Sequence, residues 1–167
     1  MTQRGYRATN ILAAADAAIA RINPLGPVLL GPAWSTAVAE SIIWLVACDD
    51  LLSRSLAYRT RRDADPDGCT LRGLRYVRNL AVHGDTVIAI AHAQPGAELG
   101  RLVLDVSRLD SRSAFGWLPR TKMPDPGRPP GVGVVPAYDS YVSGKEVSES
   151  LRRALAFARR EVGIRWP

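Results

Sequence analysis

The sequence predicts a mainly α-helical fold, a helical bundle with an irregular insertion, able to hold a β-hairpin, before its last helix. Several segments repeat apolar residues every three or four positions, which is the spacing of one helix face. The 167 residues, 47% of them apolar, fit a single domain over residues 1–167 with one core. Proline and glycine are concentrated in the insertion, at about residues 93–137, and forbid long helices there.

Two helices are expected in the first third of the chain. The first covers residues 10–23, because Thr9 or Asn10 can cap it and Pro24 ends it. The second is long and covers residues 33–59, with an apolar stripe along one face. Its two tryptophans, Trp34 and Trp44, are expected to anchor the core or an interface.

Two more helices follow further along the chain. The charged, turn-rich residues 61–68 are predicted to form a solvated loop. Thr70 then caps a third helix over residues 71–83. The last helix covers residues 147–162, with its apolar residues on one face and most of its arginines off that face.

The segment between the third and the last helix is irregular. Two short apolar runs, at residues 86–91 and 102–106, flank a Gly- and Pro-containing turn and fit a small hairpin or pieces of helix. Residues 119–136 hold several prolines and are predicted to form an extended arm or loop.

The chain carries a formal net charge of +6, and only two of its 22 basic residues are lysines, Lys122 and Lys145. This surplus favours polyanionic partners such as nucleic acid, although charge that serves solubility alone is an equal alternative. No stretch approaches the roughly 18 apolar residues that a membrane span needs. We therefore expect a cytoplasmic protein without a membrane segment.

Metal and cofactor sites are not expected. The two cysteines and two histidines, Cys48, Cys69, His83 and His92, lie far apart and lack ligand spacing. A Gly-rich phosphate loop, a nucleophile elbow and paired catalytic carboxylates are all missing from the sequence.

The third helix has one polar arc that could carry chemistry. Projection at about 100° per residue places five polar side chains on this arc and apolar residues on the opposite one. The arc consists of Arg72, Arg75, Arg78, Asn79 and His83. Guanidinium groups pair with phosphate oxygens, and histidine can carry a proton near neutral pH without a metal. The alternative is a solvated helix face on which His83 caps the last turn.

The end of this helix resembles the signature of the HEPN superfamily, written R-x(4–6)-H, with a polar residue directly after the arginine. Here the motif is Arg78, Asn79 and His83, the four-residue version with asparagine in the favoured polar position. It ends an arginine-rich amphipathic helix that follows a long helix in a small helical chain. The resemblance covers about residues 11–86.

The resemblance implies a metal-independent endoribonuclease that acts on RNA and forms a homodimer in which two motifs face one cleft. It also implies a role in toxin–antitoxin or antiviral systems, with an antitoxin protein as a partner. Arg78 would stabilise the scissile phosphate, His83 would act as acid or base, and Asn79 would position the substrate or His83. One toxin subgroup is silenced by modification of a tyrosine two residues after the histidine, but Asp85 occupies that position here.

The remaining residues of the arc, Arg72 and Arg75, are expected to bind the nucleic acid through phosphate contacts. The alternative function belongs to a different class: a noncatalytic helical module that binds RNA or a protein through the same arginine face.

A carboxylate in the apolar stripe of the second helix is the last candidate. Asp49 projects among apolar residues and therefore needs a partner. An arginine of the third helix or His83 could fill this role if the two helices pack antiparallel, and Asp49 would then orient it. The alternatives are a structural ion pair and a contact in a dimer interface.

Overall fold

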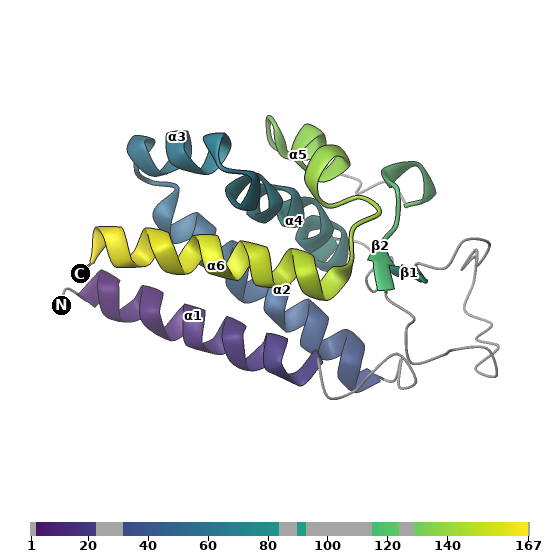
Figure 1. The fold of residues 1–167 in the computed structure, drawn as a ribbon, viewed down its shortest axis with the longest axis horizontal. Coiled ribbons are helices and arrows are strands. Elements are labelled where there is room, and N and C mark those ends of the chain that lie inside the picture. Colours follow the sequence, from purple (N-terminus) through teal and green to yellow (C-terminus); the bar gives the residue numbers. More distant parts are fainter. Residues whose placement is uncertain (1–2, 23–31, 84–89, 93–114, 124–128, 167) are drawn as a thin grey trace.

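Six α-helices pack together in the computed structural model, which describes residues 3–22, 32–83, 90–92, 115–123 and 129–166 (Figure 1). The helices are α1 (Gln3–Ile22), α2 (Pro32–Leu52), α3 (Leu56–Ala64), α4 (Pro66–His83), α5 (Val134–Tyr141) and α6 (Val147–Arg165). Two three-residue strands, β1 (Ile90–His92) and β2 (Phe115–Trp117), and a 3-10 turn, η2 (Arg120–Lys122), complete the described elements. The prediction of a mainly α-helical bundle is confirmed.

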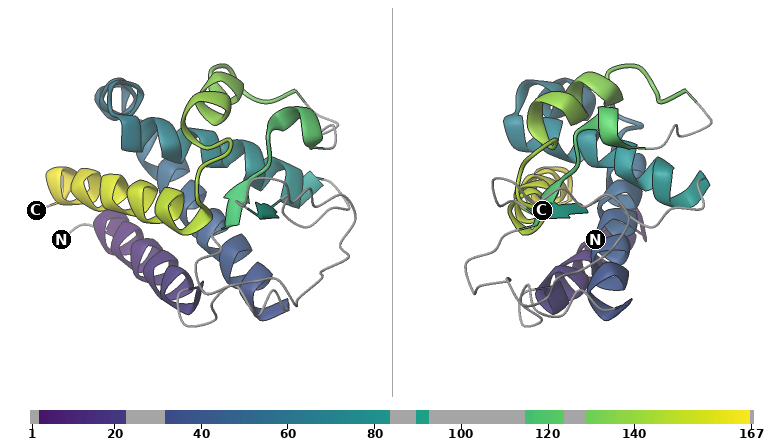
Figure 2. Two further views of the ribbon diagram at one scale, coloured as in Figure 1. Left: turned by 45° about the vertical axis from the view of Figure 1, so that its right-hand side comes forward. Right: turned by 90° about the vertical axis from the view of Figure 1, so that its right-hand side faces the viewer.

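The long helices α1, α2 and α6 lie against one another, and α4 packs on α2 and α6 (Figures 1 and 2). The short helices α3 and α5 both pack on α4. Both ends of the chain lie at the same end of the bundle (Figure 1), where Trp166 lies against Gly5 of α1. The helix α4 is therefore central, with neighbours on several sides.

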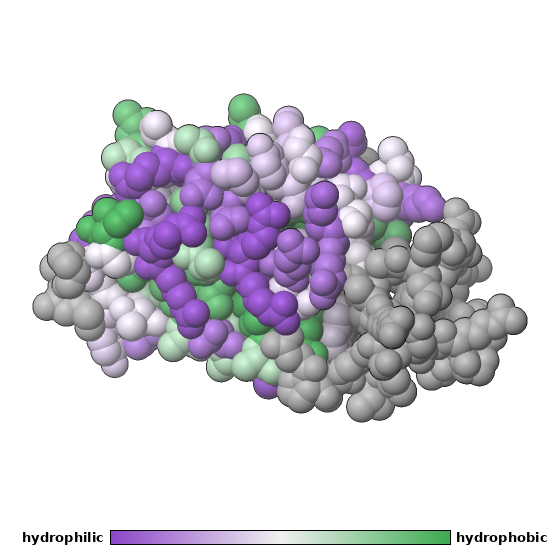
Figure 3. All heavy atoms as spheres, in the orientation of Figure 1, coloured by the Kyte–Doolittle hydropathy of each residue, from purple (hydrophilic) through white to green (hydrophobic). Residues whose placement is uncertain are grey.

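One continuous apolar core joins these helices. Its largest fully buried side chains come from α2, α3, α4, α5, α6 and β2, and they include Trp117, Tyr58, Tyr138, Phe157, Ile42, Leu45, Leu52, Leu71, Leu74 and Leu151. Trp34 is buried as predicted, whereas Trp44 is 38% exposed. Figure 3 shows hydrophilic side chains gathered over the middle of the face on which α6 lies. Among the described helices, none combines the length and apolar character that crossing a membrane requires.

The predicted second helix is in fact two helices. α2 ends at Leu52, and α3 begins at Leu56, so the prediction of one helix to residue 59 is wrong. Ser55 has extended backbone angles, and its hydroxyl accepts a hydrogen bond from the backbone N–H of Tyr58. This N-cap starts a new helix, and the change of direction brings α3 back over α4.

The start of α4 also differs from the prediction. The expected loop at residues 61–68 is instead the end of α3 and the start of α4, joined at Asp65. The Asp65 carboxylate accepts hydrogen bonds from the backbone N–H groups of Asp67 and Gly68, and Pro66 occupies the first helical position. This cap and the fixed φ of proline start the helix four residues before Thr70. Thr70 is buried within α4, and its hydroxyl donates to the Pro66 carbonyl.

The first and last helices are longer than predicted, since α1 begins at Gln3 and α6 continues to Arg165. Strand β1 overlaps the first short apolar run, at residues 86–91, and pairs antiparallel with β2. The second run, at residues 102–106, and most of the insertion lie outside the described residues.

The predicted arm at residues 119–136 is partly helical, because it contains η2 and the start of α5. α5 lies very close to α4, so a Cβ added at Gly73 would lie 2.7 Å from Cγ2 of Val142. Glycine at this position allows α4 and α5 to approach closely.

Candidate functional site

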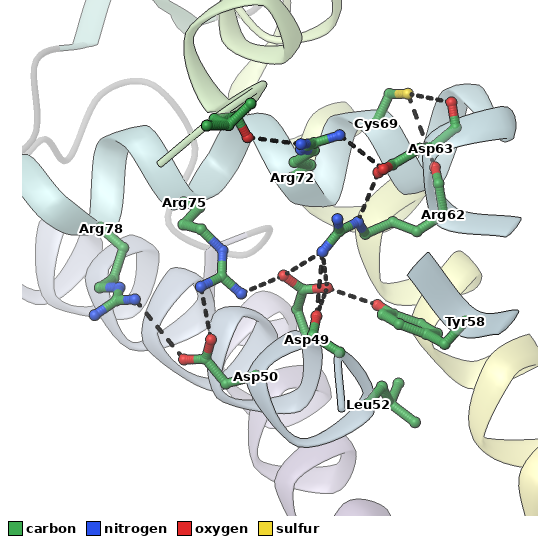
Figure 4. Close-up of polar contacts among 12 residues, drawn as sticks. Asp49, Asp50, Leu52, Tyr58, Arg62, Asp63, Cys69, Arg72, Arg75 and Arg78 are labelled. Atoms are coloured by element: carbon green, nitrogen blue, oxygen red, sulfur yellow. Dashed lines mark hydrogen bonds and ion pairs between the residues drawn. The ribbon is translucent and has the colours of Figure 1, made fainter. Parts of the chain in front are cut away.

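The two faces of α4 divide as the sequence predicts. Its apolar arc is buried, with Gly73, Leu74, Val77 and Leu80 in the core. The side chains of Arg72, Arg75 and Arg78 are 21%, 20% and 27% exposed, and their guanidinium groups point toward neighbouring elements (Figure 4). A fully solvated face therefore does not describe these three arginines.

Asp49 lies at the centre of the site and is completely buried (Figure 4). Arg75 of α4 and Arg62 of α3 both form ion pairs with its carboxylate, and the Arg62 Nη1–Asp49 Oδ1 distance is 3.0 Å. The Tyr58 hydroxyl donates a hydrogen bond of 2.8 Å, and Ser53 donates one of 3.2 Å. The expected partner on the motif helix is therefore present, within a structural ion-pair network that joins α2, α3 and α4.

Opposing effects act on the pKa of Asp49. Burial alone would raise the pKa of this carboxyl group, but the positive charges of Arg75 and Arg62 and the hydrogen bonds from Arg75 and Tyr58 lower it below its usual value. Burial and the neighbouring Asp49 charge raise the pKa of Tyr58, so the phenol remains a hydrogen-bond donor. Asp49 is thus ionised at neutral pH and fully satisfied, which suits a structural anchor.

Arg75 and Arg78 differ in how closely they contact carboxylates. Arg75 also pairs with Asp50, at 2.6 Å, and so bridges two consecutive carboxylates of α2. Arg78 reaches Asp50 only at 3.8 Å, and its Nε is buried without a hydrogen-bond partner in the part of the chain that the structure describes. Asp50 is half exposed, at 52%. Arg78 has the longest ion-pair contact and the most exposed side chain of the three arginines, so it has the most remaining capacity to bind an anion.

Arg72 joins α3, α4 and the loop before α5. Its guanidinium pairs with Asp63 at 2.8 Å and donates a hydrogen bond of 2.6 Å to the carbonyl of Val132. The next residue, Gly133, has φ of 76°, and a Cβ there would collide with the Arg72 guanidinium. Arg72 and Arg75, predicted as phosphate contacts, are thus held by protein groups, and their role in binding stays a prediction.

Substitution of Gly133 tests this contact, with Gly144 as a matched control. Both glycines have positive φ, but a Cβ at Gly144 meets nothing within 4 Å. We expect Gly144→Ala to cost only the backbone strain, about 1–2 kcal/mol. Gly133→Ala should cost about 1 kcal/mol or more beyond that, because displaced Arg72 loses a charged hydrogen bond. Urea denaturation of both variants measures the difference, and equal losses would show that Arg72 contributes nothing there.

The motif residues lie near the C-terminal end of α4. Asn79 is half-buried beside Arg78, and His83 is the last helical residue, so one continuous helix carries the whole motif. For His83 and His92 the structure describes the backbone but not the side chain. On an ideal helix, positions 78 and 83 diverge by about 140°.

Comparison of the chain with protein-family models, with curated proteins and with solved structures finds no match.

Within the described ranges, no group of three His, Cys, Asp or Glu side chains is placed to hold a metal ion. Burial and the Asp49 charge raise the pKa of the Cys48 thiol to about 12, which keeps this thiol protonated.

Sequence reasoning missed Arg62 and Tyr58. Both lie in segments read as the tail of a long helix and a solvated loop, yet they are buried and contact Asp49. Their spacing of four residues places them on one face of a helix, a signal that appears only once residues 56–64 are read as a separate helix.

Proposed function

We propose that this chain is a metal-independent endoribonuclease of the HEPN type, in which Arg78 binds the scissile phosphate and His83 transfers protons. The observation that carries the proposal is the partly exposed side chain of Arg78, which reaches a carboxylate only at 3.8 Å and lies on the same helix as His83. A phosphate oxygen can satisfy this guanidinium in a charge-assisted hydrogen bond. The short motif R-x4-H and the net charge of +6 agree with an RNA substrate.

The neighbouring network supplies rigidity to this site. Arg75 links α4 to Asp49 and Asp50 of α2, while Arg72 links α4 to Asp63 of α3. These ion pairs fix the position of α4, so Arg78 is presented on a helix that is held on two sides. A positioned guanidinium stabilises the charge that develops on phosphate more effectively than a mobile one.

The reaction that fits these groups is an internal transesterification. A base removes the proton from the ribose 2'-hydroxyl, and the 2'-oxygen forms a bond to the adjacent phosphorus. The bond from phosphorus to the 5'-oxygen breaks, and an acid gives this oxygen a proton. The products are a 2',3'-cyclic phosphate and a 5'-hydroxyl end, and Arg78 offsets the charge on the phosphate oxygens.

A homodimer completes the proposed site. One copy of the motif offers one histidine, whereas the reaction benefits from both an acid and a base. The divergence of about 140° between positions 78 and 83 also makes it difficult for one helix to surround one phosphate. We propose that two α4 helices face each other across a two-fold axis. A toxin or defence component restrained by an antitoxin protein would fit such an enzyme.

Cleavage of RNA in the presence of EDTA tests the proposal. The purified protein should cleave a single-stranded RNA in EDTA and leave 2',3'-cyclic phosphate and 5'-hydroxyl ends, because the ribose hydroxyl is the nucleophile. An Arg78→Ala, His83→Ala double variant with an unchanged circular dichroism spectrum is the control. Activity that disappears in EDTA and returns with magnesium would contradict the mechanism. Salt-dependent binding without any cleavage would instead indicate the noncatalytic RNA-binding module.

A further inference from the structure

A second candidate site lies between α1 and α2 and contains no motif residue. Here the two helices form an open groove of about 560 Å³. Its lining residues are Gln3, Arg4, Tyr6, Arg7, Asn10, Ile11, Ala14, Trp44, Leu51 and Arg54. Ile11 and Leu51 pack against the core, so they form an apolar floor beneath polar and aromatic walls. The size falls in the range of about 300–1,000 Å³ that is usual for binding pockets.

The groove is positively charged and has no acidic lining residue. Arg4, Arg7 and Arg54 line it, and none of them pairs with a carboxylate among the described residues. Most other exposed arginines of the described chain do have carboxylate partners; examples are the pairs Arg61–Glu161, Arg120–Asp139, Arg159–Asp16 and Arg160–Asp65. Three uncompensated guanidinium groups in one groove favour an anionic ligand.

Two aromatic rings lie in the same groove. Tyr6 is 60% exposed and Trp44 is 38% exposed, although large aromatic side chains usually lie in cores. Exposed rings beside a line of positive charge are typical of single-strand nucleic-acid grooves, where bases stack on the rings and phosphates contact the arginines. The amide side chains of Gln3 and Asn10 add hydrogen-bonding groups for base edges or sugar hydroxyls.

We propose that this α1–α2 groove binds a single-stranded segment of nucleic acid, with phosphates on Arg4, Arg7 and Arg54 and bases on Tyr6 and Trp44. An acidic peptide would satisfy the arginines but would leave both rings without a matching partner. A duplex would present phosphates but keep its bases stacked on one another. The site goes beyond the proposed ribonuclease function, because it contains no motif residue and its occupancy requires no cleavage.

Equilibrium binding of a labelled octanucleotide tests this inference. The probe is 2'-O-methyl RNA, which cannot undergo the transesterification, and binding is followed by fluorescence anisotropy. The triple variant Arg4→Ala, Arg7→Ala, Arg54→Ala should bind at least about tenfold more weakly. Its plot of log affinity against log salt should be shallower by about two, since each single-strand phosphate contact contributes about 0.7.

A charge-matched control separates the groove from the general field of the protein. The triple variant Arg120→Ala, Arg159→Ala, Arg160→Ala removes the same three charges from exposed, carboxylate-paired positions. It should keep its affinity within about twofold of the wild type. Equal losses in the two triple variants would overturn the proposed site, because binding would then follow net charge alone.

Variants of Trp44 test the proposed stacking of bases on the aromatic rings. Trp44→Ala should weaken binding by about fivefold to a hundredfold, the range for the loss of one base stack. Trp44→Phe should keep most of the affinity but lose the quenching of tryptophan fluorescence that the strand causes. An unchanged affinity in Trp44→Ala, or equally tight binding of a poly-glutamate peptide or of a duplex, would overturn the inference.

Failure of the groove inference can be distinguished from failure of the ribonuclease proposal, because one is tested by binding and the other by cleavage. The 2'-O-methyl probe reports binding without any cleavage, so the result does not depend on ribonuclease activity. If the groove variants lose binding while no preparation cleaves RNA, the groove inference holds and the ribonuclease proposal fails. A matching DNA octanucleotide shows whether the 2'-oxygen contributes, since phosphates and bases are common to both strands.

Discussion

An Arg62→Ala variant should have a free energy of unfolding about 3–5 kcal/mol below that of the wild type. Asp49 is completely buried and Arg62 is only 7% exposed, so neither group can be rehydrated by water when its partner is removed. The substitution deletes one of the two positive charges at the Asp49 carboxylate. It also deletes the hydrogen bond to Ser53 and the ion pair with Asp63. The buried Asp49 carboxylate then keeps Arg75 as its only positively charged partner among the described residues, and this loss of charge compensation explains the large effect.

Arg59 provides the control, because it lies on the same helix, is exposed, and has no carboxylate partner in the described structure. Arg59→Ala should change stability by no more than about 0.5 kcal/mol. Urea denaturation followed by far-ultraviolet circular dichroism measures both variants. If the free energy of unfolding of Arg62→Ala lies within about 0.5 kcal/mol of the wild-type value, a change typical of surface sites, the Asp49 network is not what holds α2, α3 and α4 together.

His83→Ala should lower the rate of RNA cleavage by about 100-fold or more, the usual contribution of a general acid or base. The substitution removes the proposed proton carrier at the end of α4 and leaves Arg78 in place. Substrate binding should therefore persist while turnover falls. Asn79→Ala should have a smaller effect, because its proposed role is to position the substrate or His83.

The second histidine of the chain is the matched control. His92→Ala removes an imidazole from β1, outside the motif, and should leave the cleavage rate unchanged. Initial rates on one defined RNA in EDTA compare the variants. Equal rates for the wild type and His83→Ala would remove His83 from the mechanism.

The sequence predicts the buried arc of α4 well because its apolar period is regular, although it places the start of this helix too late. Gly73, Leu74, Val77 and Leu80 are buried as the projection indicates, and the polar residues lie on the other side. The requirement of a partner for Asp49 also follows from the sequence, since a carboxylate in an apolar stripe cannot remain unpaired. Arg75 fills this role on the expected helix.

Helix boundaries around α3 are harder to predict, because they depend on single hydrogen bonds. The caps at Ser55 and Asp65 break a continuous helical pattern, and the sequence alone did not distinguish them from other turn-favouring residues. Once α3 is misread as part of a long helix and a loop, Arg62 and Tyr58 cannot be placed beside Asp49. The groove was missed for a different reason, since Arg4, Arg7 and Arg54 come together only when α1 and α2 are packed.

Mixing two inactive variants tests directly whether Arg78 of one subunit and His83 of the other form one site. Arg78→Ala and His83→Ala proteins, each inactive alone, are mixed under conditions that allow subunit exchange, and RNA cleavage in EDTA is then recorded. A site shared across a two-fold axis predicts partial recovery of activity, because each mixed dimer would hold Arg78 of one subunit facing His83 of the other but would lack the second histidine. If tagged subunits prove that exchange has occurred and the mixture remains inactive while the wild type cleaves, Arg78 and His83 do not act together across the proposed dimer.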